Sequence, residues 1–532
     1  MAKLAIPGAL LFMLLSLLVI PLAGFEDDEV LFLTPFRLGL TREFIIKIFH
    51  RDFPLMIMSY LGALKTWLYF PFWKLVGVSS VWGVRTPAVA LAIATLIFFS
   101  YLCYVSAGKH AAWIGPLLLA CQPVYLLTSV FDWGPVAIEH LLLTTACFCF
   151  VRYSQSRQDK FLKWGFFLLG LALWNKAIFL WALAGLTVAS VVFWTDIRSR
   201  LTLRNVGLAA GFFLLGAFPF ILYNVRHFGA TIGENAHFDT FALWPGKLFQ
   251  LRSASDGFSL FGFLTEEEGA PNPKTALSFL GGLATWLHDR GLLLRDSGFS
   301  YVGLALVAIV PLWWKSRAAR FSIVFSTVTW MAMAVSKGAG ASAHHSILLW
   351  PFPVMFVAVA LARIPWRPVS FLLVAGLALT GLSVYARHLY LFETVGAANA
   401  YSDALFRLGP ELDKVVVKDQ QVWIADWGIA NGLDVAGNGR FHLNWATGPF
   451  MQDNASPDDV RMGGLILHDP GAVFVGHVPE REFFKGVGRR IEELSHGIQL
   501  RKTVVATVAD SNGRPVYEIY RMEHASSDPQ PH

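Results

Sequence analysis

Residues 5–30, AIPGALLFMLLSLLVIPLAGFEDDEV, decide the fold class of this chain. Residues 5–24 are almost all apolar, and about 20 such residues are enough for a helix to cross a bilayer. An acidic cluster, Glu26-Asp27-Asp28-Glu29, follows at once. A cleavable signal peptide is the alternative, since Lys3 precedes the apolar core, but no convincing small-residue cleavage site follows. We therefore expect a first transmembrane helix that ends in an acidic cluster.

The composition of the whole chain extends this pattern. Of 532 residues, 55% are apolar and 15% are charged, and the mean hydropathy is +0.51. Ordinary globular chains have about 45–50% apolar and about 25% charged residues. These values exclude a soluble multidomain enzyme, a disordered chain and a disulfide scaffold, and they predict a polytopic α-helical membrane protein. About eleven apolar runs are candidate spans, near 5–24, 84–106, 111–130, 134–151, 161–175, 177–194, 205–224, 298–314, 320–336, 346–362 and 368–386.

The basic residues indicate the orientation of these spans. Arginine and lysine cluster in the short loops near 152–163, 198–204, 315–320 and 363–367, which the positive-inside rule places in the cytoplasm. The long loops 25–83 and 225–297 and the tail then face outward, with a cytoplasmic N-terminus. The net charge of +6 is explained by these loops, so no nucleic-acid partner is expected. All four cysteines lie in apolar runs, and no disulfide or cysteine metal site is indicated.

The outward segments contain further structure. Residues 35–78, and above all Phe53 to Leu75, are amphipathic and rich in aromatic residues, which predicts helices at the membrane interface. We expect the same of 225–297. Residues 1–390 form the transmembrane domain in this interpretation, and 391–532 form a small soluble α/β domain. In that domain 422–426 and 472–476 are predicted strands, 479–496 a helix, and 502–510 with 515–521 a hairpin around Ser511-Asn512-Gly513.

Ionisable groups at or near membrane depth are costly and are therefore functional candidates. Four adjacent carboxylates at 26–29 repel one another, which favours a base or a cation ligand, although a negative flank that merely ends the helix is equally compatible. A second acidic group comprises Asp132, in the turn Asp132-Trp133-Gly134-Pro135, and Glu139. On one helix, residues seven apart lie within about 20° of each other, so both would face one outer cavity. Alternatively, Asp132 caps the helix.

Cations recur at the outer ends of the spans, against the positive-inside bias. Lys176 follows Trp174-Asn175, Arg226 follows Asn224, and Lys65 lies in the first outer loop. Lys65 alone could be an interfacial anchor with its amine among the lipid headgroups. Together the cations suggest an outer-leaflet anion such as phosphate. His344 and His345 begin a later span; neighbours on a helix point about 100° apart, which favours hydrogen bonds or phosphate contacts over one shared metal ion.

Several weak motifs, in this order, resemble those of the integral-membrane glycosyltransferases of the GT-C fold. They cover about residues 1–390, and the group that they resemble most is that of the bacterial protein-mannosyltransferases and lipid A aminoarabinose transferases. The motifs are the acidic pair after the first span, Pro54-Leu55 to Val78, Arg85-Thr86-Pro87, Asp132-Trp133-Gly134-Pro135, Gly170-Leu171-Ala172 with Asn175-Lys176, Tyr223-Asn224-Val225-Arg226 with Gly229, and His344-His345 with Pro351-Phe352. The acidic cluster is longer than usual, which leaves the choice between Asp27 and Asp28 open.

The resemblance implies a sugar transfer from a polyprenyl-phosphate donor to a glycan, glycolipid or protein acceptor at the periplasmic face of a bacterial inner membrane. One carboxylate must take the proton of the acceptor hydroxyl, and cations, either side chains or a bound divalent ion, must neutralise the leaving phosphate. We expect Asp28 as the base, with Asp27 as the alternative, and Asp132 or Glu139 as an orienting group. Single displacement would invert the anomeric carbon. The remaining expected binding residues are Glu29, Lys65, Lys176, Asn224, Arg226, His344 and His345.

Two other functional classes compete with this one. A transporter or a flippase for lipid-linked glycans would use the carboxylates as a proton relay, and it would show inverted repeats with charges at the midplane. The sequence shows no repeat, and its charges cluster at the outer boundary. A non-catalytic membrane scaffold that presents the soluble tail is the third possibility.

Overall fold

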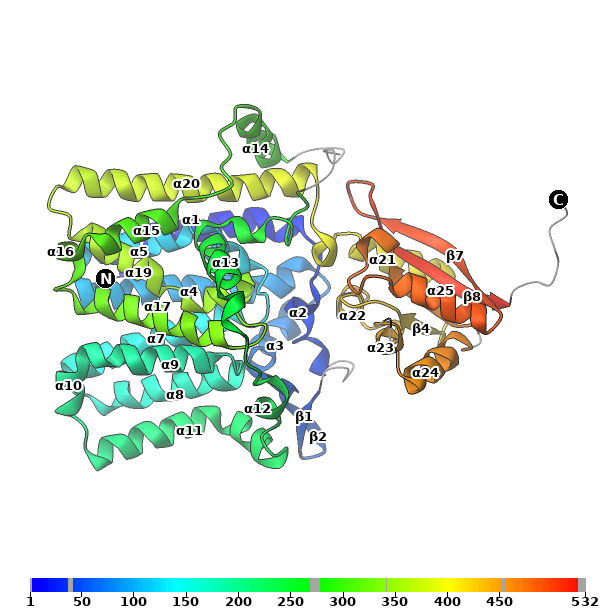
Figure 1. Ribbon diagram of the computed structural model, residues 1–532, viewed down its shortest axis with the longest axis horizontal. Helices are drawn as coiled ribbons and strands as arrows, with labels where there is room; N and C mark the ends of the chain where they lie inside the picture. The colour runs from blue at the N-terminus through cyan, green and yellow to red at the C-terminus, as the bar shows by residue number, and fades with distance from the viewer. Residues whose placement is uncertain are drawn as a thin grey trace.

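The chain forms a helical bundle followed by a small α/β domain, and both are visible in Figure 1. The computed structural model describes residues 2–36, 42–267, 278–340, 342–451, 453, 455–469 and 471–524. The bundle runs to the end of α20 (Arg367–Thr394), and the five-stranded sheet begins with β4 (Gln421–Ile424). The predicted fold class, a polytopic helical membrane protein with a soluble C-terminal domain, is confirmed.

Each of the apolar runs found in the sequence contains helix. By length and hydropathy, six helices in the described part of the chain can cross a membrane alone, or eight if two bent pairs count as one span each. The bends are 63° between α5 and α6 and 45° before α19. The helices of the bundle are α1 (Ile6–Val19), α4 (Val81–Ala107), α5 (Lys109–Ala120), α6 (Pro123–Val130), α7 (Val136–Ser156), α8 (Asp159–Asn175), α9 (Phe179–Ala189), α10 (Trp194–Arg198), α11 (Leu203–Arg226), α15 (Phe299–Ala308), α16 (Val310–Trp313), α17 (Arg317–Val335), α18 (Ala343–Ser346), α19 (Phe352–Ala362) and α20.

The two ends of the bundle differ in character. In Figure 1 the end that carries α10 and α16 lies at the left, and these helices adjoin the basic loops near 198–204 and 315–317. The other end carries α2 (Asp27–Val30), α3 (Leu64–Val76) and the C-terminal domain. The acidic cluster and the soluble domain therefore lie at the same end of the bundle, opposite these basic loops.

The first outer loop corrects one prediction. Of the segment Phe53 to Leu75, only the part from Leu64 onward, α3, is helical. Before it, β1 (Phe44–Ile48), β2 (Arg51–Met58) and β3 (Leu61–Gly62) form an antiparallel three-stranded sheet. An interface helix over all of Phe53 to Leu75 was therefore wrong for its first half. Residues 51–56 pair with the Ile-rich segment 44–48, and an apolar β-branched partner so close in sequence favours a sheet.

The second long loop, 225–297, contains three α-helices among its described residues, joined by turns and irregular segments. It contains α12 (Ala230–Asn235), α13 (Trp244–Asp256) and α14 (Phe279–Asp289). Helix α14 exposes Phe279, Leu283 and Trp286. Large apolar side chains on a loop helix suit a position at the membrane interface.

The C-terminal domain is an α/β fold, as predicted. Its sheet has the order β5-β4-β6-β8-β7; β4, β5 (His442–Trp445) and β6 (Val473–His477) are parallel, and β7 (Leu500–Ala509) and β8 (Pro515–His524) form the predicted hairpin. The predicted helix 479–496 begins later, because Pro479–Arg481 is a short 3₁₀ turn and α25 spans Val487–Gly497. Strand β5 was not predicted, nor were helices α21 (Leu405–Val415), α22 (Ala430–Ala436), α23 (Thr447–Phe450) and α24 (Pro457–Leu467).

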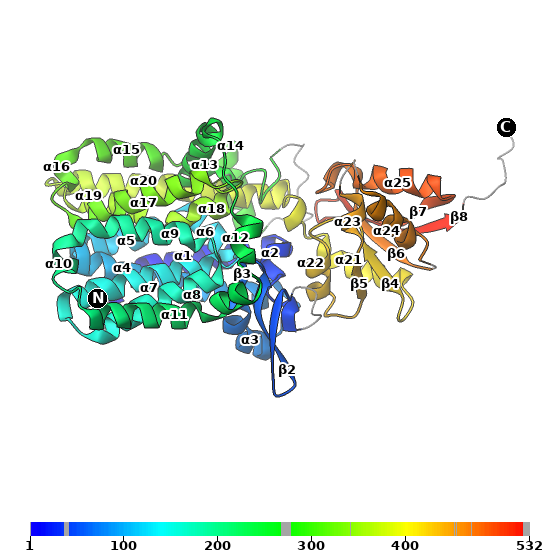
Figure 2. The ribbon, with the colours of Figure 1, turned by 60° about the horizontal axis from the view of Figure 1, so that its bottom comes forward.

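The C-terminal domain packs directly on the acidic end of the bundle. In both views α22 lies beside α2 (Figure 2). The Gly24 N–H donates to the carbonyl of Tyr401 at 2.7 Å, and the rings of Phe25 and Phe406 meet edge-on at 5.2 Å. A Cβ atom at Gly24 would lie 2.1 Å from the carbonyl oxygen of Ser402, so this close approach requires glycine. The domain is thus joined to the segment that carries the carboxylates.

Candidate functional site

The acidic cluster forms a single turn of helix, α2, with Glu26 as its N-cap. The Glu26 carboxylate accepts a hydrogen bond from the Glu29 N–H at 3.1 Å. Glu26, Asp27 and Glu29 are 2%, 7% and 1% exposed, and Asp28 is half-buried. A simple negative flank would point its carboxylates into water, so the interpretation of this cluster as a mere helix end does not hold.

Glu29 is held in a buried ion pair with Arg85 of α4. The Arg85 guanidinium donates to both carboxylate oxygens, at 2.6 and 2.8 Å, and also to the carbonyls of Ile20, Ala23 and Gly24. Both side chains are almost completely buried. This forked geometry satisfies the carboxylate and fixes the end of the first span against α4. The role of Glu29 is therefore structural, with Arg85 as its partner.

Asp132 and Lys65 form a second buried pair. The Lys65 amine lies 2.9 Å from an Asp132 carboxylate oxygen and donates to the carbonyls of Glu29 and Asp132. Tyr69 donates to the same carboxylate at 2.9 Å. Because Lys65 is 1% exposed, its alternative role as an interfacial anchor was wrong. The pair links α3, α2 and the turn before α7.

The shared-face argument for Asp132 and Glu139 was wrong, since α7 begins only at Val136. Asp132 lies before that helix with φ of 43°, and it accepts a hydrogen bond from the Ala137 N–H at 3.1 Å. Asp132 thus satisfies an N–H of the first turn of α7, which is the function of the capping alternative, although Pro135 is the N-cap residue. Glu139 accepts a hydrogen bond from Asn175 at 2.8 Å, and its second oxygen is buried without a partner.

Lys176 is a buried cation without a partner among the described residues. It is 8% exposed, and in the described part of the chain it forms neither an ion pair nor a side-chain hydrogen bond. Asp28 and Glu139 are the carboxylates whose charges act on it most strongly. Its amine would lie 3.2 Å from a Cβ atom at Gly134, in the turn that also carries Asp132. Lys176 thus lies between the two acidic groups.

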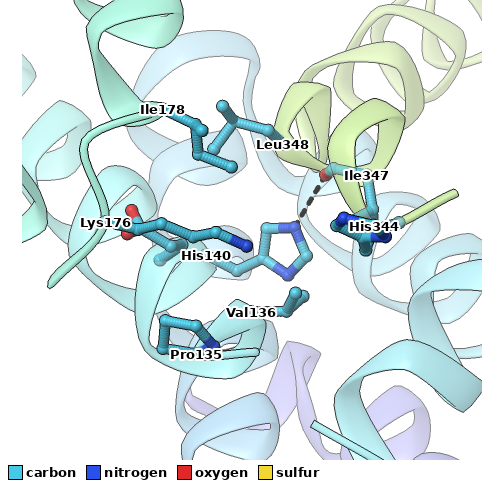
Figure 3. A pocket seen from close by; sticks show the side chains of 9 residues that line it. Pro135, Val136, His140, Lys176, Ile178, His344, Ile347 and Leu348 are labelled. Carbon is cyan, nitrogen blue, oxygen red and sulfur yellow. Dashed lines mark hydrogen bonds between the residues drawn. The ribbon is translucent and has the colours of Figure 1, made fainter. Parts of the chain in front are cut away.

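A small cavity adjoins this lysine (Figure 3). Its volume is about 10 Å³, which is room for about one water molecule. In Figure 3 the Lys176 side chain extends among the lining residues, and the His140 ring bonds the Ile347 carbonyl at 2.8 Å. The cavity is lined by Pro135, Val136, Glu139, His140, Lys176, Ile178, His344, Ile347 and Leu348. A phosphate or a sugar would enter only after this space widens.

The histidine pair borders the same region. His344 and His345 both share hydrogen bonds with the Ser342 hydroxyl, at 3.1 and 3.3 Å. The His344 ring lies 4.4 Å from the Trp133 ring, which itself stacks on Phe263 at 3.7 Å. The predicted hydrogen-bonding role for the pair agrees with these contacts. No group of three or more His, Cys, Asp or Glu side chains suited to a metal occurs among the described residues.

Burial and mutual repulsion alter the acidity of these groups. Burial, followed by the charge of Asp28, raises the pKa of Asp27 to about 7. Burial and the three neighbouring carboxylates hold the pKa of Glu26 well above its ordinary value. The pKa of Asp28 is also raised by burial, although Lys176 and Lys65 act against this. Burial lowers the pKa of Lys176, opposed chiefly by Asp28. Asp28 and Lys176 therefore stabilise each other's charged forms.

Two predicted residues lie elsewhere. Asn224, near the end of α11, accepts from the Thr231 N–H and donates to the Phe220 carbonyl. Arg226 is exposed and lies over the Phe44 ring of β1 at 5.7 Å. Their described contacts are with α11, α12 and β1, and none joins them to the acidic cluster.

Sequence reasoning missed several residues of the site. Arg85 was noted only as part of a motif, although a lone arginine at the start of an apolar run is itself a functional signal. Tyr69 lies one helical turn after Lys65, and that spacing could have placed it beside the same partner. Asn431, on α22, donates from one amide nitrogen to both oxygens of Asp27, at 3.0 Å each. No local pattern connects residues so far apart in sequence.

The fold is that of the GT-C glycosyltransferases. The crystal structure of ArnT from Cupriavidus metallidurans bound to undecaprenyl phosphate is similar over 97% of both chains, with a TM-score of 0.57 and 13% identity. Its apo state gives a TM-score of 0.55, with 13% identity over 96% of this chain and 97% of that one. The cryo-EM structure of the arabinofuranosyltransferase AftD from Mycobacteria gives 0.50 with 14% identity, over 98% of this chain but 40% of AftD. At such identities the likeness establishes the fold alone.

Sequence comparisons add no further assignment. No family model matches the chain, and no curated protein matches it. The recognition of a GT-C fold from the ordered motifs is confirmed by the structures, while the roles of individual residues depend on the geometry described above.

Proposed function

We propose that this GT-C-fold membrane protein is a glycosyltransferase that moves a sugar from a polyprenyl-phosphate donor to a glycan, glycolipid or protein acceptor. The reaction takes place at the periplasmic side of a bacterial inner membrane, with the N-terminus in the cytoplasm. The transmembrane domain comprises residues 1–390, and residues 391–532 form the periplasmic domain. The similar ArnT structure contains undecaprenyl phosphate, which supports a donor of this class.

The observation that carries this proposal is the unpaired, buried Lys176 facing Asp28. Burying a lysine without a partner is costly, and such a group is retained for a ligand that completes its pairing. A donor phosphate beside Lys176 would supply the missing charge. The cation would then stabilise the negative charge that grows on the phosphate as the glycosidic bond breaks.

Asp28 is the proposed base. The other three carboxylates of the turn are engaged, Glu26 as the N-cap, Asp27 with Asn431 and Glu29 with Arg85. Asp28 would take the proton of the acceptor hydroxyl, whose oxygen attacks the anomeric carbon while the bond to the phosphate oxygen breaks. A single displacement inverts that carbon. Asp132, fixed by Lys65 and Tyr69, orients the turn that lies beside the donor.

The remaining predicted residues have subsidiary roles in this proposal. Glu139 and its partner Asn175 hold the Lys176 segment, His344 lines the cavity on the side of the phosphate, and His345 lies beside His344. Asn224 and Arg226 would contact the donor or lipid headgroups at the rim. Asp28 and Glu139 are the carboxylates whose charges act most strongly on Lys176. If a divalent cation takes part, these two carboxylates would bind it.

Lys176→Met tests the proposal directly. Charge-assisted contacts to phosphate contribute roughly 1.5–3 kcal/mol, so transfer from a polyprenyl-phosphate sugar should fall about ten- to a hundredfold. The thermal stability should change little, because the lost attraction to Asp28 offsets the removal of a buried charge that lacks a hydrogen-bond partner. Lys74→Met, on the exposed face of α3, is the matched control and should retain full activity. Unchanged donor use in the purified Lys176→Met protein would refute the phosphate site.

A further inference from the structure

We infer that Asn431, on α22 of the C-terminal domain, is a positioning residue for the acidic turn, so that this domain completes the active site. The inference rests on the proposed function and assigns the C-terminal domain a part in it. It concerns a residue that no motif of the transmembrane domain includes.

The contact itself is short and enclosed. The Asn431 Nδ2 atom lies 3.0 Å from each carboxylate oxygen of Asp27. Asn431 is 0% exposed and Asp27 is 7% exposed, so water does not compete for this bond. An ionised carboxylate only accepts hydrogen bonds, whereas the amide nitrogen donates. Asn431 therefore stabilises the charged form of Asp27 and fixes the direction of its side chain.

The direction of Asp27 determines that of its neighbour. Consecutive residues on a helix point about 100° apart. With Asp27 bound to α22, Asp28 is directed away from the C-terminal domain, toward the charge of Lys176 and the side chain of Trp133. Within the same turn, the charge of Asp28 repels that of Asp27, and the charge of Asp27 repels that of Glu26. Without the amide, Asp27 would no longer be held out of the site, and Asp28 would lose its fixed orientation.

Loss of this one bond should leave the domain docked, because other contacts join the same surfaces. The Gly24 N–H bonds the Tyr401 carbonyl, and Phe25 packs on Phe406. A Cβ atom at Gly432 would lie 3.6 Å from the Phe25 carbonyl oxygen and 2.7 Å from the Leu405 side chain, so α22 is closely packed here. Asn431→Ala removes the amide and adds no bulk.

The kinetic test uses the full-length protein with a polyprenyl-phosphate sugar. Asn431→Ala should lower kcat about ten- to a hundredfold, as expected for a lost hydrogen bond to a charged group, and leave KM for the lipid donor within about twofold. Asn444→Ala, on β5 of the same domain, is the matched control and should behave as the wild type. In a double-mutant cycle with Asp27→Ala, the second substitution should add no further loss, because Asn431 acts through Asp27.

A second readout does not depend on sugar transfer. Because the pKa of Asp27 is raised to about 7, the stability that this group contributes is present below about pH 4 and is lost as pH rises through about 7. Asn431 lowers this pKa, so Asn431→Ala should raise it further. The melting temperature of the variant should then fall over a wider pH range than that of the wild type, with the loss extending above pH 7. Asn444→Ala should follow the wild-type curve.

The outcomes separate the two claims. If the wild-type protein transfers no sugar from any polyprenyl phosphate, the proposed function fails, and the melting curves still report whether Asn431 acts on Asp27. Parallel melting curves for Asn431→Ala and the wild type would overturn the inference. So would a kcat equal to that of the wild type, even with altered melting, because the contact would then be structural only.

Discussion

The four carboxylates at 26–29 are adjacent in sequence, but the fold gives each a different partner. Glu26 caps its own turn, Glu29 meets an arginine of α4, and Asp27 meets an amide of the C-terminal domain. Of the four, Asp28 is the carboxylate whose charge acts most strongly on the unpaired Lys176. The cluster can form despite this repulsion, because each carboxylate is either protonated or paired with a hydrogen-bond donor or a cation from a different part of the fold. Chemistry is thereby left to one carboxylate.

Asp28→Asn should therefore abolish most transfer. Asparagine keeps the size of the side chain but takes no proton at neutral pH, and a positioned general base contributes about 10²–10⁴-fold. The measurement is the initial rate of sugar transfer from the lipid donor. Glu26→Gln is the matched control: the pKa of Glu26 is held well above its ordinary value by burial, so glutamine imitates the protonated acid and its rate should hardly change. A loss at Glu26 with none at Asp28 would reverse the assignment.

Arg85→Met should act on stability. The substitution leaves Glu29 buried without a partner and three carbonyls without a donor, and breaking a buried pair in this way costs about 3–5 kcal/mol. Thermal unfolding in detergent should show a large drop in melting temperature. Arg204→Met removes the exposed pair with Asp159 and should cost less than about 1 kcal/mol. Equal melting temperatures for the two variants would contradict a structural role for Arg85.

At the scale of residues, the sequence identified site residues wherever a charged residue interrupted an apolar run. That criterion found the acidic turn, Asp132, Glu139, Lys65 and Lys176. It could not divide them into paired and unpaired groups, because pairing depends on distances between segments. Lys65 and Lys176 are equivalent in the sequence, yet Asp132 pairs with only one of them. Asn431 carries no charge and lies in an ordinary soluble domain, so nothing in its surroundings marked it.

At the scale of elements, the small sheet β1-β2-β3 positions the lysine. Its third strand approaches the end of α8 so closely that a Cβ atom at Gly62 would lie 1.9 Å from the Trp174 carbonyl oxygen. The Trp174 indole donates to the Leu55 carbonyl at 2.8 Å, and the Ala177 N–H donates to the Tyr60 carbonyl at 2.9 Å. These bonds flank Lys176 on both sides. The sheet was mistaken for a helix because aromatic, half-buried strands and interfacial helices have similar composition.

Gly62→Val should uncouple this sheet from α8. The added methyl groups cannot fit against a backbone oxygen, so we expect a destabilisation of about 1–3 kcal/mol. The displaced Lys176 segment should also lower transfer. Gly207→Ala, in α11, meets nothing within 4 Å and should instead stabilise the helix by up to about 1 kcal/mol. The melting temperatures of the two variants test the predicted loss and gain of stability, and the transfer rate tests the position of Lys176. A fully active Gly62→Val protein would show that the sheet does not position this lysine.

At the scale of the whole molecule, hydropathy alone predicted most of the architecture, because each apolar run must form its own hydrogen bonds within a helix. Bends were not predictable in this way: the run 111–130 is broken where Gln122-Pro123 follows α5, and its two halves diverge by 63°. The docking of the C-terminal domain on α2 was also inaccessible, since it depends on surface complementarity between distant segments. The acidic turn and this domain lie at the same end of the bundle. The proposal therefore requires that this end of the bundle faces the periplasm.

Cysteine labelling tests that orientation. The native cysteines at 103, 121, 147 and 149 are all buried, so the unmodified protein should react little with a membrane-impermeant maleimide in intact cells. Ser456→Cys, exposed on the C-terminal domain, should be labelled in intact cells because that domain faces the periplasm in our proposal. Ser199→Cys, exposed in the basic loop after α10, should be labelled only after the membrane is opened. The reverse pattern would place Asp28 and Lys176 on the cytoplasmic side and would exclude a periplasmic donor.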